Sequence, residues 1–195
     1  DWTFHGHEVV GSQMTEKILK NLRFSTKIIE KTVLLTRWHM FFTDTDQITL
    51  SAVRRMLSNV GVENIWDLMN VRIADRVGTG RPKEDPYRLR KYKSMIEEVI
   101  RDPISVKMLK IDGSKIMNVT QETPGPKIGY ILNALLEEVL GDPKKNIEDY
   151  LKKRTMELSK LDNQTLRGLG EKGKEKIGIE EEKEKKILRG KYGVK

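Results

Sequence analysis

The spacing of apolar residues constrains this chain most, because it follows the period of an α-helix almost throughout. Leu89, Tyr92, Ile96 and Val99 recur at intervals of three or four positions, which places them on one face of a helix. The strict alternation of apolar and polar residues that marks a β-strand is weak everywhere. The sequence therefore predicts an all-α fold, a helical bundle of about eight helices.

Residues that begin or end helices divide the chain into its expected segments. We expect four N-caps, whose side chains accept hydrogen bonds from the first helical turn: Ser25, Thr49 or Ser51, Asp85, and Asn146. Gly61 is expected to end the third helix. The residues at 141–143, Gly-Asp-Pro, are expected to end a long apolar helix that follows the rigid turn at 123–126.

Composition along the chain separates three regions. Residues 1–103 and residues 104–162 are expected to form two helical regions, with a soft boundary near 104–112. Residues 163–195 include Gly168, Gly170, Gly173 and Gly178, too many glycines for a packed helix. Residues 180–186 are a charge run with little to bury. We expect this last region to be a loosely attached basic tail, part helical and part mobile.

Several classes of protein and site are excluded by composition. The chain has no cysteine, so disulfides, thiolate nucleophiles and Cys-based zinc sites are impossible. It has three histidines and no plausible acyl-transfer triad, and we expect no catalytic residue in it. No apolar run approaches the ~20 residues of a membrane span, and no signal peptide is visible. We expect a cytoplasmic protein with no membrane partner.

The net charge of +8 is concentrated in two stretches. Residues 81–115 hold ten basic and six acidic residues, and residues 144–195 hold sixteen and ten. Two separated basic stretches suit a long polyanion better than a small anionic metabolite. The alternative is that lysine-rich helices serve only solubility.

Six basic residues of the first stretch are the main candidates for binding nucleic acid. A loop at 78–83 presents two of them, and the helix after it interleaves four more with Tyr87 and Tyr92, a pattern that suits a phosphate backbone and stacked bases. The candidates are Arg81, Lys83, Arg88, Arg90, Lys91 and Lys93. The alternative is that Leu89, Tyr92 and Ile96 face the core and the cations are only the solvated side of that helix.

A metal site is a further candidate. His5 and His7 lie two residues apart at a helix start, and His39 and Asp75 follow on later helices. His7, His39 and Asp75 could converge in a bundle and supply three nitrogen and oxygen ligands. Scattered residues of this kind are more often satisfied core or surface groups.

Several stretches, taken in order, resemble one family. Residues 4–11 (FHGHEVVG), 22–25 (LRFS) and 38–40 (WHM) are similar to the later part of an HD domain. It is the version found in bacterial CCA-adding tRNA nucleotidyltransferases and related poly(A) polymerases. Residues 52–55 (AVRR), the segment 68–78 with Ala74-Asp75, and residues 80–83 (GRPK) resemble the same enzymes. So do residues 124–140, which begin PGPKIG, and Asp142-Pro143 and Asn146. The similarity covers residues 1–161.

The resemblance implies both a domain organisation and a function. Residues 1–103 would be a partial HD-like domain, residues 104–162 a tRNA-binding helical region, and Lys127 a further RNA contact. His7, His39 and Asp75 fall at positions of remnant HD metal ligands, but no histidine here precedes an aspartate. We therefore expect no cofactor, and a divalent metal only if the HD-like site is intact.

Nothing in this sequence corresponds to the family's nucleotidyltransferase head. We therefore expect a C-terminal piece of a longer enzyme, inactive by itself. It would bind tRNA and position the 3′ end for CCA addition by a head on the same or a longer polypeptide. Two alternatives stay open, a divergent HD-type metal-dependent phosphohydrolase and a helical interaction module.

Overall fold

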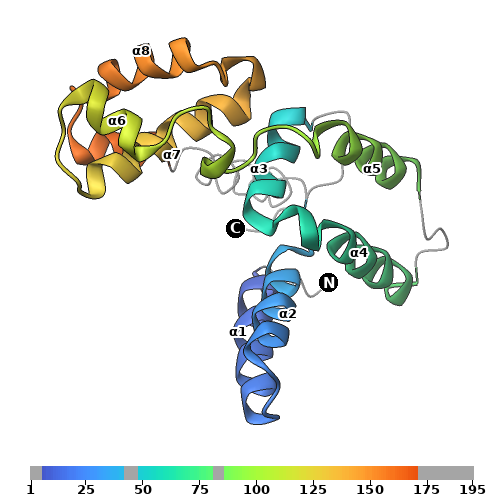
Figure 1. Ribbon diagram of the computed structural model, residues 1–195. Helices are drawn as coiled ribbons and strands as arrows, with labels where there is room; N and C mark the ends of the chain where they lie inside the picture. Colours follow the sequence, from blue (N-terminus) through green and yellow to red (C-terminus); the bar gives the residue numbers. More distant parts are fainter. Residues whose placement is uncertain (1–5, 42–47, 81–85, 171–195) are drawn as a thin grey trace, which may run out of the picture. The chain divides into compact units, whose positions relative to one another are not determined.

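A computed structural model describes residues 6–41, 48–80 and 86–170 of the chain. The chain divides into two compact units, Asp1–Arg101 and Asp102–Lys195. All regular secondary structure among the described residues is helical (Figure 1). The all-α prediction is therefore confirmed.

The helices follow one another with short connections. Unit 1 contains α1 (His7–Asn21), α2 (Thr26–Trp38), α3 (Leu50–Val60), the short 3₁₀ helix η1 (Val62–Asn64), α4 (Ile65–Gly78) and α5 (Tyr87–Val99). Unit 2 contains η2 (Val106–Met108), α6 (Gly113–Thr120), α7 (Pro126–Gly141), η3 (Pro143–Lys145) and α8 (Glu148–Leu158). Residues 163–170 are also helical.

The core of unit 1 lies between α3, α4 and α5. Leu57, Ile65, Leu68 and Ile96 are fully buried there, and each such side chain contributes about 1.5–3 kcal/mol to folding. Thr49 caps α3 by accepting a hydrogen bond from the backbone of Ala52, as its sequence position predicts. α3 ends at Gly61, where φ is +85°, a conformation that glycine adopts without the strain a side chain brings.

The hairpin of α1 and α2 buries much less. The two helices lie side by side (Figure 1), but their only buried residues are Ser12 and Ile29. At the interface, an ideal Cβ on Gly11 would lie 3.6 Å from Thr36 Cγ2. The helical period of the apolar residues correctly predicts these two helices. Many apolar residues of this segment are nevertheless exposed: Val10, Met14, Ile18, Leu22, Phe24 and Ile28.

The core of unit 2 is built around α7. Ile131, Leu135 and Val139 of α7 are fully buried, together with Ile116 of α6 and Leu151 of α8. Asp112 caps α6 by accepting from the backbone N–H of Lys115 at 2.8 Å. Pro126 begins α7, where a missing N–H and a fixed φ suit the first helical turn.

Helical residues 163–170 belong to this core, although the sequence indicates a loosely attached region from 163 onward. Asp162 accepts hydrogen bonds from the backbone N–H groups of Gln164 and Thr165, each at 2.9 Å, which fixes the helix start. Leu166 is fully buried. A Cβ on Gly170 would lie 2.9 Å from the Asn133 Cβ, so this glycine permits close packing on α7.

Among the other predicted N-caps, Ser25 occupies the N-cap position of α2 but makes no side-chain capping bond. Asp85 lies outside the described residues, and the residue before α5 is Pro86, with α5 beginning at Tyr87. The prediction for Asn146 is wrong, because the residue that caps α8 is Ile147 and it makes no side-chain capping bond. The amide of Asn146 instead bonds to the backbone of Met108 and Lys110. Sequence position alone cannot reveal that partner, because it lies 36–38 residues away.

Candidate functional site

The outer surface of α5 carries four of the predicted RNA-binding residues. Leu89, Tyr92 and Ile96 are 0–3% exposed and face the core, so the predicted inner face is confirmed. Arg88 and Arg90 are exposed, and Lys91 and Lys93 are half-buried. Residues three apart are neighbours on a helix surface, so these cations form two adjacent pairs, Arg88 with Lys91 and Arg90 with Lys93.

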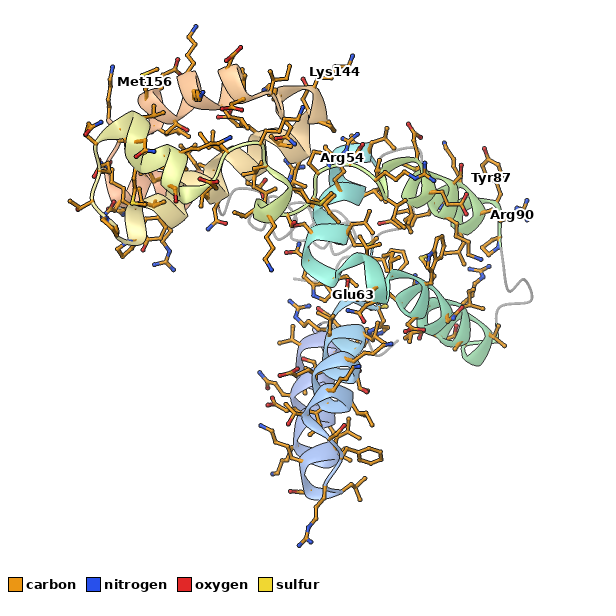
Figure 2. The ribbon with its side chains drawn as sticks, in the orientation of Figure 1. Arg54, Glu63, Tyr87, Arg90, Lys144 and Met156 are labelled. Carbon is orange, nitrogen blue, oxygen red and sulfur yellow. The ribbon has the colours of Figure 1, made fainter. Side chains whose placement is uncertain are left out.

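The two tyrosines of α5 have different environments. Tyr92 donates a hydrogen bond to Met56 Sδ at 3.0 Å and stacks on Phe41 with ring centroids 5.0 Å apart. Burial raises the pKa of Tyr92 above its ordinary value. Tyr87 is 65% exposed, and Figure 2 shows it near Arg90 at the N-terminal end of α5. Of these two aromatic rings, Tyr87 is therefore the one available to stack on a base.

The other three predicted RNA contacts lie outside the described part of unit 1. Arg81 and Lys83 lie outside the described residues. Lys127 belongs to unit 2, where its half-buried ammonium pairs with Glu122. The charge of Lys127 is therefore already partly compensated within the chain.

Two of the three predicted metal ligands meet. His7 Nε2 lies 3.3 Å from His39 Nε2, and the two rings pack edge to face. His39 Nδ1 lies 2.6 Å from the carbonyl oxygen of Thr36. A carbonyl only accepts, so this nitrogen donates, and in a neutral ring Nε2 must then accept from His7. The carboxylate of Glu8 lies 3.9 Å from His7 Nδ1.

Asp75 does not complete a metal site with these histidines. Its carboxylate accepts a hydrogen bond from Arg72 at 3.1 Å, and Arg72 also contacts Met40 Sδ at 3.3 Å. Within the described ranges, no three His, Cys, Asp or Glu side chains form a group that could hold a metal ion. The described side chains therefore do not form a site that fits a divalent metal ion.

Comparison with known proteins places the chain in a family. Residues 2–154 match the family described as tRNA nucleotidyltransferase domain 2, putative. Because this match covers most of the 195 residues, the chain belongs to that family.

A curated relative supports the same family. The A-adding tRNA nucleotidyltransferase of Deinococcus radiodurans is 28% identical over 139 residues. That alignment covers 69% of this chain but 31% of the relative, so the chain spans about a third of the relative's length. No solved structure matches. None of the described helices is long and apolar enough to cross a membrane.

Proposed function

We propose that this chain is the tRNA-binding helical portion of a tRNA nucleotidyltransferase. Its role is to hold the tRNA so that the 3′ end reaches a separate catalytic head for CCA addition. The observation that carries the proposal is the cationic outer surface of α5, opposite a buried inner face, in a chain of this family. Cations fixed on a rigid helix can bind several phosphates of one backbone.

Recognition through the sugar–phosphate backbone suits an enzyme that serves every tRNA. Phosphate contacts fix register and orientation without reading sequence. Arg88, Arg90, Lys91 and Lys93 supply such contacts, and the exposed ring of Tyr87 adds a surface for stacking. Arg81 and Lys83 belong to the segment immediately before this helix and extend the same basic stretch.

The proposed partner is a nucleotidyltransferase head on the same or a longer polypeptide. The exposed apolar side chains of the α1–α2 hairpin support a protein partner. Val10, Met14 and Ile18 of α1 and its C-cap residue Leu22 recur every fourth residue and are 52–63% exposed. Contiguous exposed apolar surface on a folded protein marks an interaction site.

A divergent metal-dependent phosphohydrolase is not favoured. His7 and His39 are adjacent, but Asp75 is engaged by Arg72. A helical module whose charge serves only solubility is the remaining alternative, and a nucleic-acid titration separates it from the proposal.

The test is a titration of the full chain against a fluorescently labelled tRNA transcript, followed by anisotropy over a range of salt concentrations. With about four to six phosphate contacts, the log–log slope of affinity against salt is expected at roughly −3 to −5. The chain alone is expected to add no nucleotide to tRNA that lacks its CCA end. Salt-independent or absent binding would refute the proposal.

A further inference from the structure

The side chain of Asn146 joins two turns of unit 2 that are far apart in the sequence. Its Oδ1 accepts from the backbone N–H of Lys110 at 2.9 Å, and its Nδ2 donates to the carbonyl oxygen of Met108 at 3.0 Å. Both ends of the amide are therefore used. The bonds hold residues 108–110 against the turn that follows α7, so the two turns present one surface with a fixed backbone.

This surface combines exposed lysines with exposed apolar side chains. Met108 is 43% exposed and Ile147 is 54% exposed. Leu109, which lies between Met108 and Lys110 in the sequence, is buried in the core. Lys144 extends from the turn between α7 and α8 (Figure 2). We call the following residues the Asn146 surface: Lys107, Met108, Lys110, Lys144 and Ile147. Its three lysines are all exposed.

The charge of the Asn146 surface is not cancelled locally. Within the part of the chain that the structure describes, the ammonium groups of its three lysines form no ion pair. The nearby carboxylate of Glu148 is held by Lys115 at 3.4 Å and Lys152 at 2.9 Å. Asp142 accepts a hydrogen bond from the backbone of Lys144, and Asp149 is exposed on the first turn of α8. Asp112 also lies here and accepts a hydrogen bond from the backbone of Lys115. With Lys115, Lys145 and Lys152 included, six lysines stand against these four carboxylates, so the surface is positive.

A second network keeps the turn after α7 rigid. Lys145 lies over the ring of Tyr150, 5.8 Å from its centroid. The Tyr150 hydroxyl donates to Glu138 at 2.7 Å, and the other oxygen of Glu138 accepts from Arg154 Nε at 2.7 Å. Side chains of α7 and α8 thus hold the residue next to Lys144 in place, which limits the ordering cost of binding.

We propose that the Asn146 surface is a second RNA contact, specific for an unpaired stretch of the RNA. Lys107, Lys110 and Lys144 bind phosphates, while a base or ribose of an unstacked nucleotide packs on Met108 and Ile147. Paired RNA presents phosphates but keeps its base faces stacked, whereas loops and ends expose both. The inference rests on the proposed tRNA binding and adds a site that the α5 residues do not include.

The first experiment tests the charges, with the full chain and a labelled tRNA transcript. Lys110→Ala with Lys144→Ala is expected to lower affinity roughly tenfold and to flatten the salt slope by about 1.4 to 1.8, the value for two phosphates. The matched control is Lys153→Ala with Lys160→Ala, which removes the same charge from exposed positions further along unit 2. It is expected to change affinity less than about twofold.

The second experiment tests the apolar contact. Met108→Ala with Ile147→Ala is expected to weaken binding to tRNA severalfold without changing the salt slope, because no counterion is released by these side chains. Binding to a fully paired RNA hairpin stem is expected to be unaffected by this variant. An equal loss on both RNAs would overturn the preference for unpaired RNA.

The outcomes separate this inference from the proposed function. If the unaltered chain does not bind tRNA, the proposed function itself fails. If it binds tRNA but the lysine variant and its control lose affinity equally, the proposed function stands and the Asn146 surface is refuted. If the lysine variant loses binding to phosphatidylserine vesicles while its tRNA affinity is unchanged, the surface binds lipid and the inference is wrong.

Discussion

His7 and His39 meet through their Nε2 atoms, 3.3 Å apart, at the open end of the α1–α2 hairpin. His7 is the first residue of α1, and His39 follows the last residue of α2. The backbone carbonyl of Thr36 fixes the orientation of the His39 ring. The histidine contact therefore links the two helices at the end where Arg37 also pairs with Glu8, 3.8 Å apart. The two histidines are therefore explained as a structural contact between α1 and α2 that requires no metal ion.

The first prediction concerns that pair. Two imidazoles with no third ligand grouped beside them among the described residues hold a divalent ion weakly. Elemental analysis of the purified chain is therefore expected to show far less than one metal ion per chain. His7→Ala is expected to leave the metal content unchanged. A metal content near one per chain that falls on His7→Ala would contradict this and support the phosphohydrolase alternative.

The second prediction identifies the face of α5 that contacts RNA. Arg88→Ala with Lys91→Ala removes one cation pair, and Arg90→Ala with Lys93→Ala removes the other. Removal of the pair that faces the RNA backbone is expected to flatten the salt slope of tRNA binding by roughly 1.4 to 1.8. It is also expected to weaken the binding of different tRNAs alike. Anisotropy titrations of both variants decide between the faces. If neither variant alters affinity or slope, α5 is not the binding helix.

The third prediction compares the same substitution at two levels of burial in unit 1. Ile18 is 52% exposed and Ile96 is fully buried. Ile96→Ala is expected to lower the free energy of unfolding by about 2–5 kcal/mol, whereas Ile18→Ala is expected to change it by less than about 0.5 kcal/mol. Urea denaturation followed by circular dichroism measures both. A large cost at Ile18 would show that the α1 face is buried in solution.

The fourth prediction tests the packing of helical residues 163–170. Leu166→Ala is expected to destabilise unit 2 by about 2–5 kcal/mol, because it opens a cavity among fully buried side chains. Gly170→Ala is expected to destabilise it as well, since the new methyl group would approach the Asn133 Cβ to 2.9 Å. Thermal denaturation checks both. Wild-type stability of Leu166→Ala would mean that this segment is detached.

The fifth prediction concerns Tyr150. Burial and the hydrogen bond to Glu138 raise the pKa of Tyr150 to about 12. Because its folded pKa exceeds the ordinary value of 10.0, the neutral phenol stabilises the fold below pH ~10, and this contribution is lost as the pH rises through the folded value. Ultraviolet titration of phenolate is expected to show two late-ionising tyrosines, Tyr92 and Tyr150, and Glu138→Gln is expected to shift only the Tyr150 transition to lower pH. The assignment is wrong if Tyr150→Phe removes neither late transition.

Helical periodicity, local capping and turn residues were sufficient to predict most of the fold. Thr49 and Gly61 act where their positions predict, because a cap and its partner lie within one helical turn. The inner face of α5 was predictable for the same reason, since residues three and four apart share a helix face.

Tertiary structure decided what each face and polar side chain contacts. The periodicity of α1 predicts a helix but not that Met14 and Ile18 remain exposed, because burial depends on a partner that the local sequence does not specify. Asn146 has the sequence position of a cap, yet it bonds to a turn 36–38 residues earlier. Local hydrogen bonds are set by the neighbouring sequence, whereas these contacts form only when distant segments meet on folding.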